Sequence, residues 1–534
     1  MALALGARNE LEIHVFHDER SASFAALGIG IESGRAAILL CTSGTAAVQF
    51  HAAAVEAHHA EVPMLICTAD RPPELQGVGA PQTIDQQNLY GVATRKFVDA
   101  GVADNDDVSG WRGLARDCVE ATCGISPGPV HLNLPFREPL IGETGELPPV
   151  HDPRPLTCTA PSSPLIAEVD VLVSLLQGKR GVLVAGAGCD AGGGVLELAR
   201  VLGWPVLADP RSGCRVVEST SPVVVAAADT LLRVEDFARA HCPDVIVRFG
   251  EPPISKVVNQ WLRDSGAQYI ALSTTPRIID PDRIVTHHVV GSMSQWCTAL
   301  IADLGKSTQQ SAFDTAWLGS WQHAESAAQQ AISASLMSEK ILTEPAVARA
   351  LSKLVPSGSR LVVSSSMPVR DLEWFAEPRD GLPVYANRGA SGIDGVVSTA
   401  VGVALASHAP TYLFIGDIAM LHDSNGLIGL AQRKVDVRII CIDNRGGGIF
   451  SFLPQAMSLN AERFEQLFGT PHNSDIALIA QAHGVTSRIA DSMENFVNQV
   501  ALAGSWLMCI STNRTENVAV HERLNTSVGR ALVR

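Results

Sequence analysis

Asp417 and Asn444 are the residues of this chain whose types and spacing point most directly to chemistry. Asp417 follows the apolar run Tyr412–Gly416, and Asn444 follows the apolar run Ile439–Asp443 and is followed closely by three glycines. Such runs predict buried strands, and ligands bind at the carboxyl ends of parallel strands. Because carboxylate and amide oxygens are hard ligands, this pair suits Mg²⁺ and a phosphate better than zinc.

The segment between these two residues must return the chain to the same edge of the sheet. Its length fits one helical crossover between parallel strands, and residues His422–Gln432 are predicted to form that helix. An ordinary strand, helix and strand with a glycine turn would have the same pattern. Asp417 and Asn444 therefore do not define a cofactor site by themselves.

The rest of the chain alternates short apolar strands with helices, which is typical of parallel, doubly wound α/β sheets. The proline-rich residues Arg137–Pro164 and the helical, Ala/Ser/Gln-rich residues Gln309–Ser338 predict two linkers. We therefore expect an α/β fold with three doubly wound parallel-sheet domains, at residues 1–150, 165–308 and 339–534.

The first of these domains shows the alternation most clearly. In chain order we predict a strand at Leu11–Phe16, a helix at Ser21–Glu32, strands at Ala36–Cys41 and Pro63–Cys67 on either side of a helix at Ala46–His58, and a last strand at Gly128–Pro135. Gly34 is expected to end the first of these helices, because glycine readily adopts the left-handed conformation of a helix end.

The overall composition excludes several classes of partner. A net charge of −15 argues against nucleic acid and anionic membrane surfaces. None of the 11 cysteines forms a CxxC pair, which favours reduced thiols in a cytoplasmic protein, mostly packed in the core. The chain contains no apolar run of about 18 residues, so no membrane span is expected.

Residues Gly181–Gly192 combine a predicted strand with a glycine-rich turn and partly resemble the dinucleotide-binding fingerprint. No acidic residue is clear at the end of a following strand, so tight packing of a strand against a helix is the preferred interpretation. A dinucleotide-dependent oxidoreductase would rest on this segment alone.

Several short segments resemble, in residues and in order, a single family of enzymes. They are His17–Ser21, Thr42–Thr45, Ala69–Leu75, Gln82–Gln86, Gly128–Leu140, Met367–Arg370, Asn387–Asp394, Gly446–Phe450 and Phe468–His472. With Asp417 and Asn444, they make the chain similar to the 2-succinyl-5-enolpyruvyl-6-hydroxy-3-cyclohexene-1-carboxylate (SEPHCHC) synthases, the MenD family of thiamine diphosphate (ThDP)-dependent enzymes. The resemblance is dense in the first and third predicted domains and loose in the second.

The resemblance implies a reaction, its cofactors and an assembly. The reaction is decarboxylation of 2-oxoglutarate and 1,4-addition of the succinyl carbanion equivalent to isochorismate, in menaquinone or phylloquinone biosynthesis. The implied cofactors are ThDP and Mg²⁺, with Mn²⁺ as a substitute. In this superfamily the carboxylate on the aminopyrimidine ring and the diphosphate site come from different chains. A homodimer or homotetramer with sites between subunits is therefore implied.

The resemblance also implies roles for individual residues at the cofactor. Glu19 is expected to contact the aminopyrimidine ring, and Ile393 is expected to hold the cofactor in a bent shape. The implied metal ligands are Asp417, Asn444 and the carbonyl oxygen of Gly446. Further cofactor contacts are expected from Thr42, Ser366, Gly416 and Ile449.

Two anionic substrates in a protein of net charge −15 require focused local positive charge. Guanidinium groups suit this role because they bind carboxylates through two hydrogen bonds. The resemblance implies that Gln82, Arg370 and Arg388 act in catalysis with Glu19 and also bind substrate. It further implies substrate contacts from Arg71, Lys256 and Phe450. Taken singly, each arginine is compatible with a surface ion pair, and Lys256 with a solvated position.

Two features depart from the family pattern. Residues Met1–Leu5 resemble the inside of the family's first helix, so we expect its first strand and a Ser-Arg loop to be missing, through a start-site error or a truncation. Arg445 stands where the family commonly has asparagine. Two alternatives stay open, namely another ThDP-dependent 2-oxo acid decarboxylase or acetolactate-type synthase, and an inactive, truncated or merely ligand-binding copy.

Overall fold

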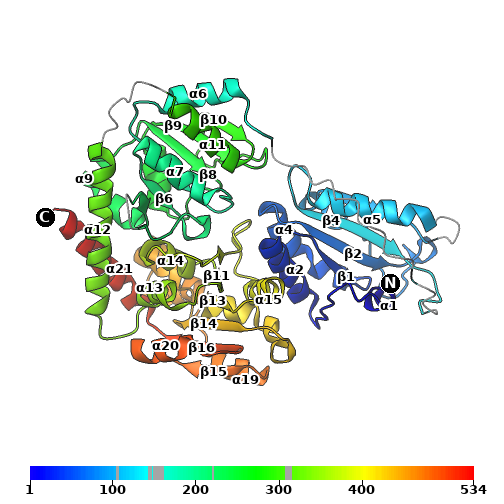
Figure 1. Ribbon diagram of the computed structural model, residues 1–534. Helices are drawn as coiled ribbons and strands as arrows, with labels where there is room; N and C mark the ends of the chain where they lie inside the picture. Colours follow the sequence, from blue (N-terminus) through cyan, green and yellow to red (C-terminus); the bar gives the residue numbers. More distant parts are fainter. Residues whose placement is uncertain (104–107, 142–146, 148–161, 219–221, 307–314, 534) are drawn as a thin grey trace.

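The computed structural model describes residues 1–103, 108–141, 147, 162–218, 222–306 and 315–533. These residues form three β-sheets, each flanked by helices (Figure 1). Every pair of neighbouring strands is parallel. The predicted α/β fold of three parallel-sheet domains is therefore confirmed, whereas the predicted domain boundaries stay a prediction.

The first sheet has four strands in the order β1-β2-β4-β3. They are β1 (Ala37–Cys41), β2 (Met64–Asp70), β3 (Lys96–Asp99) and β4 (Pro129–Pro135). Alternate residues of β2 face opposite sides of the sheet. Met64 and Ile66 pack with helices α2 (Glu19–Ser33) and α4 (His51–His59), whereas Leu65 and Cys67 face α5 (Val108–Thr122). The sheet is thus doubly wound.

The strand predicted at Leu11–Phe16 is wrong. These residues are extended but form no strand, and Leu11, Ile13 and Val15 are 41%, 50% and 75% exposed. A strand exists only where a neighbour exchanges backbone hydrogen bonds with it, and the sheet order places no described strand beside this segment. The helix that follows is confirmed, because α2 ends at Ser33 and Gly34 caps it with φ 65°.

The central sheet has six strands in the order β10-β9-β8-β5-β6-β7. They are β5 (Gly181–Ala185), β6 (Val206–Ala208), β7 (Val224–Val225), β8 (Val245–Phe249), β9 (Gln268–Ser273) and β10 (His287–Val290). After β5, a Cβ on Gly186 would lie 1.8 Å from the carbonyl oxygen of Glu251. This close backbone contact supports packing, rather than a dinucleotide, as the reason for the glycine-rich turn.

The third sheet has six strands in the order β12-β11-β13-β14-β16-β15. They are β11 (Arg360–Val363), β12 (Val384–Tyr385), β13 (Thr411–Gly416), β14 (Val437–Asp443), β15 (Thr486–Ile489) and β16 (Trp506–Ser511). Helices α13 (Glu344–Leu354) and α14 (Met367–Phe375) pack on one face, and α15 (Val396–Ser407) packs on the other. Gly416 at the end of β13 lies opposite Ile442 in β14.

The crossover between β13 and β14 differs from the prediction of one helix at His422–Gln432. The helix is α16 (Asp417–His422), which begins directly after β13 and is followed by two short 3-10 turns. The buried carboxylate of Asp423 accepts hydrogen bonds from the backbone and hydroxyl of Ser398. This tertiary contact favours a helix end at this point.

Two segments predicted as linkers have different outcomes. Most of Arg137–Pro164 lies outside the described residues. Within Gln309–Ser338, the expected helix is present as α12 (Thr315–Met337). Its buried side chains, which include Trp317 and Trp321, belong to the core of the central domain. In the parts of the chain that the structure describes, no helix is both long and apolar enough to cross a membrane.

The first and third domains meet where α2 crosses α15 (Figure 1). A Cβ on Gly28 would lie 2.1 Å from the carbonyl oxygen of Thr399, and one on Gly402 would lie 1.9 Å from that of Ala25. The two helix backbones approach so closely that neither position has room for a methyl group. Glycine at both positions therefore determines how the two domains pack.

We predict that Gly28→Ala lowers the free energy of unfolding by roughly 1–3 kcal/mol, because the added methyl group overpacks the helix contact. Gly193→Ala is the matched control, since no atom lies within 4 Å of its Cβ position. This control is expected to be neutral or slightly stabilising. Urea unfolding midpoints measure both effects, and equal midpoints for the two variants would contradict the prediction.

Candidate cofactor and metal site

Four neighbouring strands of the third sheet end at one edge, where most of the predicted third-domain site residues lie. In sheet order, Arg388 follows β12, Ser366 and Arg370 follow β11, Asp417 follows β13 and Asn444 follows β14. The carboxyl ends of parallel strands point the same way, so residues distant in the chain become neighbours. Arginine side chains occupy one part of this edge and oxygen ligands occupy the other.

Asp417 is the most buried member of the group, with 1% of its surface exposed. Its Oδ1 accepts a hydrogen bond from the N–H of Ile418 at 2.7 Å, and its Oδ2 accepts one from the N–H of Gly446 at 2.9 Å. The second bond ties the loop after β14 to the end of β13. Gly446 contributes its N–H to this contact, and the predicted role of its carbonyl oxygen stays a prediction.

Two residues join Asp417 that the sequence did not single out as ligands. Asp417, Asp443 and His472 each offer a ligand atom within 4.8 Å of the others, and His472 Nε2 lies 3.3 Å from Asp417 Oδ2. Burial raises the pKa of Asp417, and the neighbouring charge of Asp443 also raises it. A divalent cation would relieve this repulsion. The sequence did contain a hint of His472, because it is the last residue of the family-like segment Phe468–His472. That resemblance implied no role for the histidine.

Asn444 presents a side-chain oxygen that is buried and has no hydrogen-bond partner in the described part of the chain. Its amide nitrogen donates to Glu344 Oε1 at 3.2 Å, and the hydroxyl of Thr512 donates to the same oxygen at 2.9 Å. Because Glu344 binds the amide nitrogen of Asn444, the amide oxygen of Asn444 points away from Glu344. A buried acceptor without a partner is costly unless a ligand fills it. The donor set of carboxylates and an amide oxygen fits Mg²⁺.

Space for a cofactor lies beside the same strand end. Around the position that a Cβ of Gly416 would occupy, no atom lies within 4 Å. Ser366 adopts φ 75°, which is strained for a residue other than glycine. Ile393 lies in the loop before α15 and is partly buried. An open space beside a glycine fits the close approach of a diphosphate group to the backbone.

Glu19 is the first residue of α2 and lines a cavity of about 710 Å³ between the first and third domains. Thr42 and Gln82 line the same cavity, and Gln82 Nε2 donates to Thr42 Oγ1 at 3.0 Å. From the third domain, Asn425 and Ile428 complete the wall. The structure therefore brings together three of the four residues of the first domain that were predicted to meet the cofactor or substrate, and Arg71 does not line this cavity.

Arg370 and Arg388 lie close enough to repel each other. Arg370 donates to the carbonyl oxygen of Ser366 at 2.5 Å, and Arg388 donates to Ser365 Oγ at 3.2 Å. Burial lowers the pKa of Arg388, and the positive charges of Arg211 and Arg370 lower it further. Neither arginine forms an ion pair with a carboxylate in the described part of the chain. Such a pair suits an anionic ligand.

The remaining predicted substrate residues lie elsewhere or contribute apolar surface. Arg71 Nη2 donates a hydrogen bond to the carbonyl oxygen of Pro81 at 3.4 Å. Lys256 is exposed and lines a different cavity, on the central domain, with Trp261. Phe450 is partly buried, with its ring 5.5 Å from that of Phe468, and Ile449 precedes it in a 3-10 turn. The roles of these residues stay predictions.

Arg445, which departs from the family pattern, has a clear position. It adopts φ 57°, its N–H donates to Asp443 Oδ1 at 3.2 Å, and its side chain is exposed. The guanidinium group is therefore outside the buried cluster around Asp417.

Comparison with protein families defines the class of the protein. Residues 1–89 match the model for the thiamine pyrophosphate enzyme, N-terminal TPP binding domain. Residues 151–363 match the middle domain of thiamine pyrophosphate, and residues 364–505 match the thiamine pyrophosphate enzyme, C-terminal TPP binding domain. The fold and the matched domains thus define a thiamine diphosphate enzyme, with thiamine diphosphate as its cofactor.

Similar proteins of known name identify the family within this class of enzymes. A protein of Chloroflexus aurantiacus named 2-succinyl-5-enolpyruvyl-6-hydroxy-3-cyclohexene-1-carboxylate synthase is 38% identical over 543 residues, covering 100% of this chain and 92% of the relative. A protein with the same name from Lysinibacillus sphaericus is 37% identical, and the match covers 98% of this chain and 92% of that relative. Another from Geobacillus kaustophilus is 36% identical, and the match covers 100% of this chain and 94% of that relative. The chain belongs to the SEPHCHC synthase family.

We predict that Asp417→Asn weakens divalent-cation binding by at least about tenfold, because a charged ligand contributes more than a neutral one. Titration of the ThDP-loaded protein with Mn²⁺, followed by electron paramagnetic resonance of the free ion, measures the affinity. Asp491→Asn, which changes an exposed carboxylate on the same domain, is the control and is expected to leave the affinity unchanged. Equal affinities for the two variants would contradict the prediction.

Proposed function

We propose that the protein catalyses SEPHCHC synthesis in menaquinone biosynthesis. In this reaction 2-oxoglutarate loses CO₂, and the remaining succinyl unit adds to isochorismate. Thiamine diphosphate, held with Mg²⁺ or Mn²⁺, supplies the electron sink that makes loss of CO₂ from a 2-oxo acid feasible. The names of the relatives and the residues of the site support this proposal.

One observation carries the choice of substrates. Arg388 and Arg370 stand at the ends of β12 and β11, next to the strand end that carries Asp417. They are partly buried, close to each other and form no ion pair with a carboxylate in the described part of the chain. Each guanidinium can pair with one carboxylate. 2-Oxoglutarate has two carboxylates and isochorismate has two, which suits a pair of arginines beside the cofactor.

The acidic residues would hold the cofactor and its metal. Asp417, Asn444 and the carbonyl group of Gly446 would provide oxygen ligands to the metal ion. Asp443 and His472 would stabilise the same cation. Gly416 and Ser366 would approach the cofactor through backbone and hydroxyl groups, and Ile393 would keep it bent. Glu19 would exchange a proton with the aminopyrimidine ring. Thr42 would line the same part of the site.

The remaining residues would bind substrate and exclude water. Gln82, fixed by its bond to Thr42, would position the 2-oxo acid. Arg71 and Lys256 would add positive charge toward isochorismate. Ile449 and Phe450 would form an apolar wall, which protects a carbanion equivalent from protonation by water.

A complete site would need two subunits. The resemblance pairs the Glu19 cavity of one protomer with the Asp417 edge of its partner, so we propose a homodimer or homotetramer. Glu19 lines a cavity with Asn425 and Ile428, and none of the metal-binding candidates lines it. Because Glu19 and the metal-binding candidates do not share a cavity within one chain, a second copy of the chain could bring them together.

Another ThDP-dependent decarboxylase or acetolactate-type synthase is the alternative activity. Pyruvate has a single carboxylate, so such an enzyme would leave one of the two arginines unmatched. Purified protein with ThDP and Mg²⁺ is expected to consume 2-oxoglutarate only when isochorismate is present, and to act poorly on pyruvate. Turnover of pyruvate alone would favour the alternative. ThDP binding without any turnover would favour an inactive copy.

We predict that Glu19→Gln lowers kcat by roughly 10²–10⁴-fold, because a positioned acid–base group contributes that much to catalysis. The affinity for ThDP is expected to change little, since most of its contacts would come from the third domain. Glu12→Gln, at an exposed position in the same segment, is the control. Steady-state kinetics and fluorescence titration with ThDP separate the two effects, and an unchanged kcat would remove Glu19 from the mechanism.

A further inference from the structure

Helix α14 carries Arg370 and is one of the elements of the third domain that contact the central domain. Its residues Met367, Leu372 and Phe375 are buried. Apolar contacts of this kind hold a helix in place, and directional polar contacts, such as that between Asp371 Oδ1 and His521 Nε2 at 2.6 Å, help to fix its rotation about its own axis. Rotation matters here, because it decides where the guanidinium group of Arg370 lies relative to Arg388.

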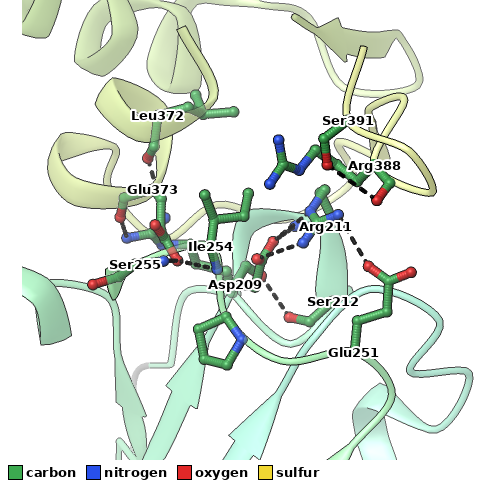
Figure 2. Close-up of polar contacts among 12 residues, drawn as sticks. Asp209, Arg211, Ser212, Glu251, Ile254, Ser255, Leu372, Glu373, Arg388 and Ser391 are labelled. Carbon is green, nitrogen blue, oxygen red and sulfur yellow. Dashed lines mark hydrogen bonds and ion pairs between the residues drawn. The ribbon is translucent and has the colours of Figure 1, made fainter. Parts of the chain in front are cut away.

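Glu373 provides a directional contact from α14 to the central domain. Its Oε1 accepts hydrogen bonds from the N–H groups of Ile254 and Ser255, both at 3.0 Å (Figure 2). These N–H groups precede α10 (Lys256–Asp264), whose first backbone donors have no partner within the helix. The carboxylate thus caps a helix of one domain from a helix of another.

Arg215 provides a second directional contact, in the opposite sense. Its guanidinium donates to the carbonyl oxygens of Leu372 at 3.2 Å and of Glu373 at 2.7 Å. These carbonyl groups lie in the last turn of α14, where the Leu372 carbonyl also accepts the N–H of Ala376 at 3.2 Å. The Arg215 side chain is buried and also donates to the carbonyl oxygen of Ala226. The central domain therefore binds both a side chain and the backbone of the same helical turn.

Glu373 lies on the same face of α14 as Arg370. Glu373 follows Arg370 by three positions, so the two side chains lie on one face of the helix. Figure 2 shows Arg388 and Arg211 beside this contact, and Arg211 is bound by Asp209 and Glu251. The charges around Arg370 and the capping contacts thus belong to one continuous interface.

From this geometry we propose that Glu373 is a positioning residue, which with Arg215 sets the rotation of α14 and thereby places Arg370 for the carboxylate of the 2-oxo acid. The central domain then acts in substrate recognition through a contact that does not touch substrate. This inference rests on the proposed function for the identity of the substrate. The contact itself does not depend on that function.

The chemistry of Glu373 allows a sharp choice of variants. Burial, and then repulsion from Asp209 and Asp229, raises the pKa of Glu373 to about 8. Glutamine is neutral and keeps an acceptor oxygen for both N–H groups, whereas alanine leaves the two donors unpaired. Glu373→Gln should therefore preserve the position of α14, and Glu373→Ala should not.

Glu218 offers a matched control. Its side chain is 4% exposed, and its Oε2 accepts hydrogen bonds from the N–H groups of Val223 at 2.7 Å and Val224 at 3.0 Å. These contacts lie within the central domain, and in the described part of the chain Glu218 has no hydrogen bond to α14. Glu218→Ala should reduce stability through the same kind of loss, without moving Arg370.

The test combines kinetics with hydrogen exchange on the full-length, ThDP-loaded protein. We predict that Glu373→Ala raises KM for 2-oxoglutarate by about tenfold or more, from the loss of two buried hydrogen bonds, with little change in kcat or ThDP affinity. Glu373→Gln is expected to stay within about twofold of wild type. Amide exchange in α14 should accelerate in Glu373→Ala and not in Glu218→Ala.

Three results would overturn the inference. These are an unchanged KM and unchanged exchange in Glu373→Ala, an equal rise of KM in Glu218→Ala, and failure of Glu373→Gln to restore the wild-type values. If Glu373→Ala does not fold, Glu373→Asp withdraws the carboxylate by one methylene and should raise KM in the same direction. If the wild-type protein does not turn over 2-oxoglutarate, the proposed function fails, and exchange in α14 still tests the contact.

Discussion

The parallel order β12-β11-β13-β14 places four strand ends side by side, and every candidate role in the third domain depends on that order. Arginines follow the first two strands, and oxygen ligands follow the next two. The bond from the Gly446 N–H to Asp417 then ties the last two loops together. An antiparallel neighbour would direct its side chains to the opposite edge. The chemistry of the site is therefore a consequence of sheet topology.

Burial of polar groups at this edge has a common physical logic. Asn444 keeps its amide oxygen free because Glu344 accepts from its nitrogen, and Asp417 is held among backbone donors. Such groups are costly in a folded core unless a ligand satisfies them. The same logic applies to the arginine pair, whose like charges favour an anion between or beside them. The net charge of −15 makes this local concentration of positive charge more significant.

The central domain carries only one of the predicted site residues, Lys256, yet its contacts reach the candidate site. Glu373 and Arg215 connect it to the helix that carries Arg370, and Arg211 lies beside Arg388. These residues were not predicted, since a glutamate near a helix end and an arginine in a loop have no local pattern. Their partners are between about one hundred and two hundred residues away in the chain. Only the packing of two domains reveals what they do.

Local physical chemistry made much of this protein readable from its sequence. Apolar runs that end in Asp417 and Asn444, the glycine stop after α2, and the alternation of strands and helices follow from short-range preferences, and all are present in the structure. The segment Leu11–Phe16 shows the limit, because its residues favour a strand but a strand also needs a neighbour. Likewise, the approach of His472 to Asp417, the orientation of Asn444 by Glu344, and the capping of α10 by Glu373 depend on contacts between distant segments. Composition and periodicity carry no information about such contacts, so only the tertiary structure decided them.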